Sequence, residues 1–218
     1  MKSQDPNQEH LQSIINLYTE GQLQQALSES SQMLERFPNS VILYNIAGAS
    51  NAALMQFDAA IDSYKQALKI KPDYADAYYN MGISMKDKGD LEEAIDSFKQ
   101  ALKIKPDFAD AYNNMGSALK EKGHLEEAID SYKQALKIEP GYAEGHSNLG
   151  AALQLLNQTE QALASYEKAI SLKKDLNTAI SGLGMALLKK GEHSEGLDKL
   201  RQGDGSILFN IKSGLSIK

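Results

Sequence analysis

The feature that most constrains this sequence is a stretch that repeats itself at a fixed interval. Residues 75–108 and 109–142 align without a gap and share 24 of 34 letters. A period of this length is typical of solenoids, in which each unit is one helical hairpin that becomes stable only by stacking on its neighbours. The sequence therefore predicts an elongated array instead of the one or two globular domains that 218 residues would otherwise suggest.

The first half of the unit at 75–108 has the periodicity of an amphipathic helix. Tyr78, Met81 and Met85 are three and four residues apart, which puts them on one helical face. Gly82 lies on the same face, and a glycine inside a helix costs about 1 kcal/mol relative to alanine. We therefore predict that Gly82 leaves room for a side chain of a neighbouring helix.

The second half of the unit is a second amphipathic helix. Its buried face is expected to comprise Ala94, Ile95, Phe98, Ala101 and Leu102, with the alanines allowing close helix packing. Gly89, between the halves, can adopt the left-handed conformation that ends a helix, and Pro106 stops the second helix. The unit is therefore helix, tight turn, helix, stop.

These positions resemble the signature of the tetratricopeptide repeat (TPR), with Tyr78 where that family most often has tryptophan. The resemblance implies an all-α fold, an α-solenoid of six TPR hairpins forming a right-handed superhelix. The predicted repeats are 7–40, 41–74, 75–108, 109–142, 143–176 and 177–210. The last repeat is degenerate because Gly196 and Gly203 replace alanines, so its final helix should end near Arg201 or Gln202. Residues 1–6 are expected to be disordered, and residues 211–218 form a tail.

Three local departures from the repeat carry expectations of their own. Met55 occupies a turn position where glycine is expected, which predicts an altered turn. Lys174 replaces the proline that ends other repeats, which would let that helix run on into the next repeat. In the segment 203–218, Ile207, Phe209 and Ile211 alternate weakly like a strand. A mobile end, a segment packed on the last hairpin and the first strand of a further domain all stay open for it.

Composition excludes several classes of function. The chain has no cysteine, so disulfides, thiolate chemistry and cysteine-ligated zinc are excluded. A formal charge of −6 argues against nucleic acid as the partner. No apolar run is long enough to span a membrane, and the first residues lack the pattern of a signal peptide, so we expect a cytoplasmic protein with no membrane partner.

The sequence contains no recognisable catalytic constellation. There is no glycine-rich phosphate loop, no nucleophile elbow and no pair of histidines at helical spacing. The paired glutamates at 92–93 and 126–127 begin second helices, where the helix dipole favours them. We therefore expect no catalytic residue, no cofactor, no metal and no enzyme activity.

The candidate site residues come from the TPR resemblance, which implies that the first helices line a concave peptide-binding groove. The candidates are Asp76, Asp110 and Glu144 at the second position of the repeat, Tyr79 and Asn113 at the fifth, Asn80, Asn114 and Asn148 at the sixth, and Lys86 and Lys120 at the twelfth. The asparagines recur in three consecutive repeats. An amide both donates and accepts, which suits a grip on an extended peptide backbone. Alternatively, these asparagines bond only to the adjacent repeat.

The array is also similar to the TPR segment of O-GlcNAc transferase, in which asparagines hold peptide backbone. The stretches 108–123 and 146–150 carry that similarity, and nothing in the chain resembles a glycosyltransferase domain. The carboxylate clamp of other TPR proteins needs basic residues at the second, fifth and sixth positions. Acidic, aromatic and amide residues stand there instead, which disfavours that mode.

Three hypotheses of function follow. The first is a non-enzymatic scaffold that binds a peptide or protein segment in the groove. The second is the targeting arm of a larger enzyme, such as a glycosyltransferase, methyltransferase or 2-oxoglutarate oxygenase. The third is a self-assembling scaffold, a weak homo-oligomer in which the end faces or the tail dock on another copy.

Overall fold

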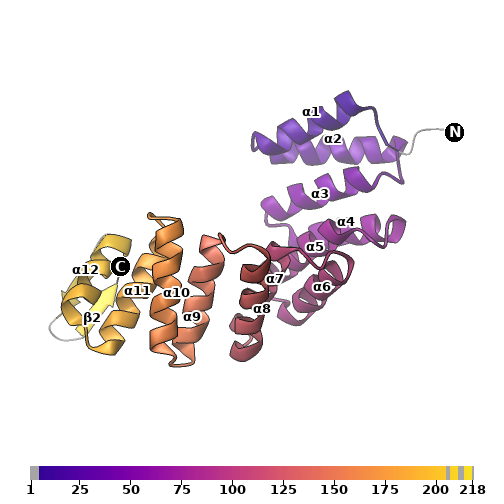
Figure 1. The fold of residues 1–218 in the computed structure, drawn as a ribbon. Coiled ribbons are helices and arrows are strands. Elements are labelled where there is room, and N and C mark those ends of the chain that lie inside the picture. Colours follow the sequence, from indigo (N-terminus) through magenta and orange to yellow (C-terminus); the bar gives the residue numbers. More distant parts are fainter. Residues whose placement is uncertain (1–4, 205–206, 211–213, 218) are drawn as a thin grey trace. The chain divides into compact units, whose positions relative to one another are not determined.

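The computed structural model describes residues 5–204, 207–210 and 214–217, with side chains up to residue 203. The chain divides into two compact units, an N-terminal unit of Met1–Asp107 and a C-terminal unit of Phe108–Lys218. Each unit contains three helical hairpins, formed by consecutive helices that pack on each other (Figure 1). The predicted α-solenoid of six hairpins is thus confirmed.

The helices of the N-terminal unit are α1 (Gln8–Thr19), α2 (Leu23–Arg36), α3 (Val41–Ala53), α4 (Phe57–Ile70), α5 (Ala75–Lys88) and α6 (Leu91–Ile104). The helices of the C-terminal unit are α7 (Ala109–Glu121), α8 (Leu125–Ile138), α9 (Ala143–Leu155), α10 (Thr159–Leu172), α11 (Asn177–Lys190) and α12 (His193–Asp204). Two strands follow, β1 (Ile207–Asn210) and β2 (Gly214–Ile217). In the part of the chain that the structure describes, no helix combines the length and apolarity needed to cross a membrane.

The glycine at the eighth position of the repeat fits against an aromatic ring of the paired helix. A Cβ atom built on Gly82 would lie 2.8 Å from Cε1 of Phe98, which is too close for two carbon atoms. Gly116 stands in the same relation to Tyr132, again at 2.8 Å. Both rings are fully buried. The packing role predicted for Gly82 is therefore confirmed. It recurs in the second to fifth hairpins, where the eighth-position glycine faces an aromatic ring of the paired helix.

The turn at Met55 is not altered, so that prediction was wrong. Met55 adopts φ 60°, in the left-handed region that Gly89 occupies with φ 98°. The N–H of Gln56 donates to the carbonyl of Asn51 at 2.8 Å, as the N–H of Asp90 does to the carbonyl of Met85 at 2.9 Å. Packing of the two helices fixes the turn geometry, so the residue is strained instead of the turn changing shape.

We expect Met55→Gly to raise the free energy of unfolding by about 0.5 to 1 kcal/mol. Relief of a left-handed non-glycine residue yields about 1 to 2 kcal/mol, and the greater freedom of glycine in the unfolded chain offsets part of it. Little packing is lost because the Met55 side chain is 74% exposed. Denaturant midpoints test this, with Gln56→Gly as the matched control, since Gln56 has φ −90°. Equal or opposite changes in the two variants would contradict the strain assigned to Met55.

Helix α10 does not run on into the next repeat, so the prediction for Lys174 was wrong. The helix ends at Leu172, and Lys173 is extended with φ −139° and ψ 99°. Its N–H still donates to the carbonyl of Ala169 at 2.9 Å, as the corresponding residue Glu139 does to Ala135 at 2.8 Å. Because the next hairpin must reverse direction to stack, its packing ends the helix without a proline.

Both ends of the array differ from the predicted limits. Residues 1–4 lie outside the described residues, but Pro6 is buried and the hydroxyl of Ser40 donates to Oδ1 of Asp5 at 2.5 Å, so these two are not disordered. At the other end, α12 continues to Asp204, and β1 pairs antiparallel with β2, with Ile207 opposite Ile217. The helical part of the last repeat therefore ends at Asp204, before residue 210. Strand β1 falls within the predicted repeat and strand β2 within the predicted tail.

Candidate functional site

The first helices of the hairpins form one side of each unit. Helix α1 contacts α3, and α3 contacts α5, while α7 contacts α9 and α9 contacts α11. We call this side the groove face. In the N-terminal unit it carries a pocket of about 290 Å³ lined by Tyr18, Ala49, Ala52, Ala53, Tyr64, Asn80, Ile83, Ser84 and Asp87. All of these residues except Tyr64 belong to first helices, so the pocket opens on the groove face.

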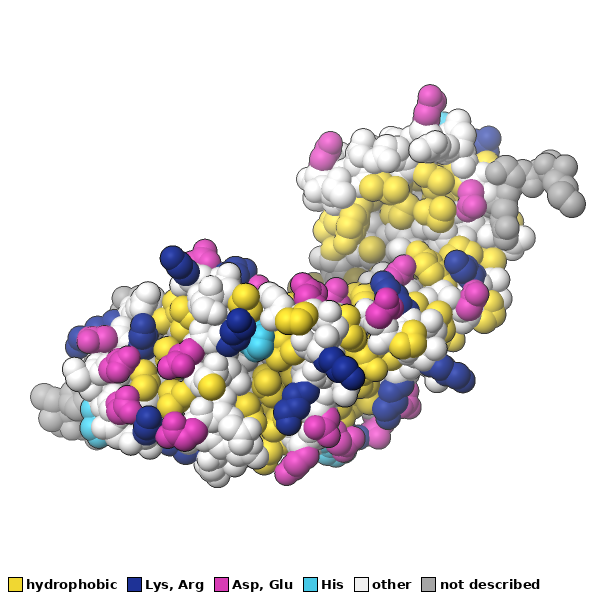
Figure 2. All heavy atoms as spheres, viewed as in Figure 1, with side chains coloured by type: hydrophobic (Ala, Val, Ile, Leu, Met, Phe, Trp, Pro, Cys, Tyr) yellow, Lys and Arg dark blue, Asp and Glu magenta, His cyan; other side chains and the backbone are white. Residues whose placement is uncertain are grey.

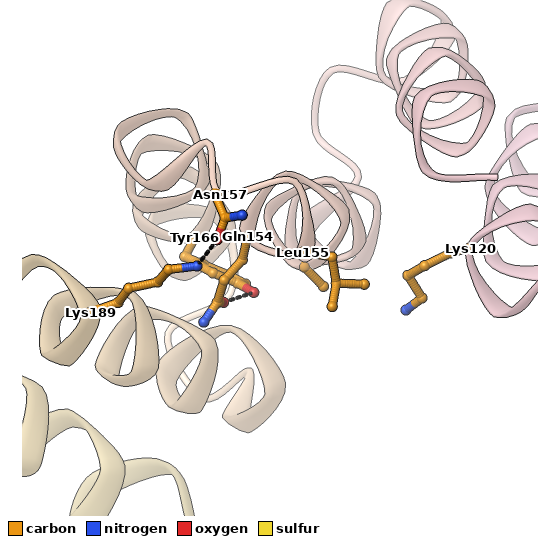
Figure 3. Close-up of a pocket in the computed structure, with 7 residues that line it drawn as sticks. Lys120, Gln154, Leu155, Asn157, Tyr166 and Lys189 are labelled. Carbon is orange, nitrogen blue, oxygen red and sulfur yellow. Dashed lines mark hydrogen bonds between the residues drawn. The ribbon is translucent and has the colours of Figure 1, made fainter. Parts of the chain in front are cut away.

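The C-terminal unit carries a second pocket on its groove face, of about 470 Å³, shown in Figure 3. It is lined by Lys120, Ala151, Gln154, Leu155, Asn157, Tyr166 and Lys189. The Tyr166 hydroxyl donates to Oε1 of Gln154 at 2.9 Å. Burial raises the pKa of Tyr166 to about 12, so this hydroxyl keeps its proton through the neutral range.

Two of the three predicted asparagines pair with an asparagine of the preceding repeat. Nδ2 of Asn80 donates to Oδ1 of Asn45 at 3.3 Å, and Nδ2 of Asn148 donates to Oδ1 of Asn113 at 3.0 Å. Within the described residues, the amide side chains of these two pairs make no further hydrogen bond, although the hydroxyls of Ser84 and Ser117 donate to the backbone carbonyls of Asn80 and Asn113. Each pair therefore retains an amide oxygen that accepts and amide hydrogens that can be donated, in addition to its role between repeats.

The third asparagine is held differently. Nδ2 of Asn114 donates to the backbone carbonyl of Asp110 at 3.1 Å, within helix α7. The fifth position of the preceding repeat is Tyr79 instead of an asparagine, so the asparagine–asparagine pair seen in the other two cases is not formed here. The alternative of bonding to the adjacent repeat thus describes Asn80 and Asn148.

The acidic candidates lie outside both pockets. Asp76 is exposed, and Oδ1 of Asp110 accepts a hydrogen bond from the hydroxyl of Tyr142 at 3.0 Å. Glu144 accepts from Lys173 at 2.9 Å, and this hydrogen bond is the largest cause of the lowered pKa of its carboxyl group. Two of the three acids are therefore already engaged in links along the array.

Three further candidates have mixed placements. The ring of Tyr79 contacts that of Phe98, with centroids 6.1 Å apart, and is half-buried. Lys86 forms an ion pair with Asp87 at 2.9 Å. Lys120 lines the larger pocket, as Asn80 lines the smaller one. The structure thus brings two of the ten candidates into pockets.

Sequence reasoning missed Leu155, Lys189 and Gln154 in the larger pocket, and Ile83 and Asp87 in the smaller one. A signal for them was present, because they occupy the ninth, twelfth and thirteenth positions of their repeats, which the TPR resemblance also places at the groove. Unlike the asparagines, these five residues differ in type from their equivalents in the neighbouring repeats, so no recurring residue type indicates them.

The surface of the C-terminal unit carries charges of both signs (Figure 2). Figure 2 shows Lys and Arg side chains interspersed with Asp and Glu side chains over the C-terminal unit on the face in view. Exposed charges separated by more than about 8 to 10 Å are largely screened at physiological salt. The local set of side chains, more than the overall charge, therefore decides what each pocket attracts.

Comparison with family models identifies the class of protein. A model described as TPR repeat matches residues 53–89, 84–123 and 116–157, and one described as tetratricopeptide repeat matches residues 143–176. Together these matches extend over more than half of the chain. The chain belongs to the tetratricopeptide repeat family.

Two curated proteins share segments with it. The peroxisomal targeting signal receptor of Candida albicans is 43% identical over 47 residues, which are 22% of this chain and 8% of the receptor. A probable UDP-N-acetylglucosamine–peptide N-acetylglucosaminyltransferase, SEC, of Arabidopsis thaliana is 33% identical over 72 residues, which are 33% of this chain and 7% of that protein. The chain therefore spans less than a tenth of either relative.

Solved structures share the fold over most of the chain. MamA is 28% identical with a TM-score of 0.67, covering 75% of this chain and 89% of MamA. The type IV pilus biogenesis factor PilW is 21% identical with a TM-score of 0.80, covering 89% of this chain and 91% of PilW. YrrB, described as a TPR protein with an unusual peptide-binding site, is 19% identical with a TM-score of 0.65, covering 81% of this chain and 91% of YrrB. The last two likenesses concern the fold alone.

Proposed function

We propose that this chain is a protein-interaction scaffold whose groove face binds an extended segment of a partner protein. The observation that carries the proposal is that each unit has a pocket lined mainly by its first helices. Family membership supports it, as does the similarity over 47 residues to a protein named as a receptor for a targeting signal. The scaffold needs no catalytic group of its own.

The asparagines supply the proposed grip on the partner's backbone. Asn80 lines the pocket of the N-terminal unit, and its Oδ1 is available to a peptide N–H. Asn45, whose Oδ1 accepts from Asn80, has amide hydrogens available to a peptide carbonyl. An asparagine pair of this kind presents the same donor and acceptor as a peptide group, so it can bind backbone with little dependence on side chains.

A peptide display selection on the full chain tests this function. We expect selected peptides of differing sequence to compete with one another for binding, because backbone contacts dominate. Methylation of alternate peptide nitrogens should weaken binding, since it removes backbone donors. Selection of a single strict motif that tolerates backbone methylation would contradict the asparagine grip, and failure to select any peptide would contradict the scaffold function.

The targeting arm of a larger enzyme is a second candidate. The observation that favours it is the 33% identity over 72 residues to the Arabidopsis N-acetylglucosaminyltransferase, of which this chain spans 7%. In that case the groove face would select substrates for a catalytic domain elsewhere in the protein. The gene's reading frame decides between the two, because a targeting arm must be continuous with a catalytic domain.

A further inference from the structure

The polar side chains that line the pocket of the C-terminal unit present hydrogen-bond donors. Oε1 of Gln154 accepts from Tyr166, and Oδ1 of Asn157 accepts from the ammonium group of Lys189. Each carboxamide oxygen is therefore engaged within the protein, and within the described residues the NH₂ group of each amide has no acceptor. Lys120 adds a third nitrogen group with hydrogens to donate. A ligand that satisfies these groups must bring acceptors.

The two lysines of this pocket are not neutralised by carboxylates. Neither Lys120 nor Lys189 forms an ion pair with an acidic side chain in the part of the chain that the structure describes. Other lysines of this unit form such ion pairs: Nζ of Lys190 lies 2.9 Å from Oε1 of Glu192, and Nζ of Lys173 lies 2.9 Å from Oε1 of Glu144. The pocket therefore carries positive charge that a bound carboxylate would balance.

The same pocket has an exposed apolar part. Leu155 is 59% exposed, and Ala151 and the buried Tyr166 line the same pocket. Figure 3 shows Leu155 with Lys120 on one side and Lys189 on the other. Covering an exposed leucine with an apolar side chain is favourable, because it removes apolar surface from water.

We propose that this pocket binds a short acidic and hydrophobic segment of the partner, in which carboxylates flank one large apolar side chain. The apolar side chain covers Leu155, and the flanking carboxylates accept from Lys120 and Lys189. Because the whole chain has a formal charge of −6, an acidic peptide is not drawn to it by net charge, and the attraction is local. The inference rests on the proposed function and names the class of partner for this pocket.

The test is a titration of the ¹⁵N-labelled chain of 218 residues with a synthetic peptide of glutamates around one central leucine. We expect the side-chain amide signals of Gln154 and Asn157 to shift. Lys120→Gln and Lys189→Gln should each weaken binding about two- to fivefold, the range for partly exposed ion pairs. Lys133→Gln with Lys137→Gln on α8 is the matched control, because both lysines are exposed and lie outside the pocket. The double control should leave the affinity nearly unchanged.

A second peptide, with glutamines in place of the glutamates, separates this inference from the proposed function. If the two peptides bind equally, or the control variant weakens binding as much as the pocket variants, the acidic preference is overturned. If the glutamate peptide leaves the amide signals unshifted while display-selected peptides still bind, the inference fails and the scaffold function stands. If no peptide of any kind binds, both fail.

Discussion

Gly116→Leu is expected to lower the free energy of unfolding by about 1 to 3 kcal/mol or more, the range for overpacking a well-filled core. A Cβ atom alone at this position would lie 2.8 Å from Cε1 and 2.9 Å from Cδ1 of Tyr132. The ring cannot move into solvent cheaply, because Tyr132 is fully buried. A leucine adds three more carbon atoms to the same space, so α7 and α8 must separate.

The comparison variant is Gly123→Ala, in the turn after α7. Gly123 has φ +88° and no atom within 4 Å of a built Cβ, so the cost is local strain of about 1 kcal/mol. Denaturant midpoints of the two variants measure the difference. If Gly123→Ala lowered the midpoint more than Gly116→Leu, the contact between this glycine and the ring would not be what limits substitution.

Replacing Asn80, Asn114 and Asn148 together with alanine is expected to weaken peptide binding by roughly one to three decades. Each neutral hydrogen bond contributes about 0.5 to 1.5 kcal/mol net, less where water substitutes for the lost amide. The loss should depend little on the peptide's side chains and only modestly on salt. Affinities of display-selected peptides, measured by titration calorimetry, test this.

The triple variant is also expected to lose some stability, so it needs a control. Asn148→Ala leaves Oδ1 of Asn113 without its donor, and Asn113 is only 6% exposed, so some stability is lost as well. The folded fraction must therefore be matched before affinities are compared. The control is alanine at Gln66, Gln100 and Gln134, which are exposed amides recurring on the second helices of three consecutive hairpins. An equal loss of affinity in both triple variants would show that the asparagines have no special part in binding.

Local periodicity accounts for what could be predicted of the fold. The space needed at Gly82 and the left-handed turn at Gly89 both follow from a few neighbouring residues, and both are present. The predictions at Met55 and Lys174 were wrong because they rested on the conformational preference of a single residue, whereas helix packing determines the backbone there. A hairpin that must stack fixes its own turn and its own end, so one unfavourable residue is tolerated there.

The site was less predictable, because its contacts join repeats. The hydrogen-bonded asparagine pairs are 35 residues apart, one more than the repeat period, so the sixth position of one repeat meets the fifth position of the repeat before it. Asn45 could have been found by searching at that offset. The bonds that engage the oxygens of Gln154 and Asn157 depend on side-chain orientation, which no pattern in the sequence indicates.

Protection of single cysteines tests most directly whether the groove face is where the partner binds. The chain has no cysteine, so one can be introduced at a time without background. Ala53→Cys and Leu155→Cys place a thiol in the lining of each pocket, and Gln100→Cys and Gln134→Cys place one on an exposed second-helix position. With a saturating display-selected peptide, alkylation by iodoacetamide should slow severalfold at one or both pocket positions and stay unchanged on the second helices. If alkylation slowed at the second-helix positions and kept its rate at the pocket positions, binding on the groove face would be contradicted.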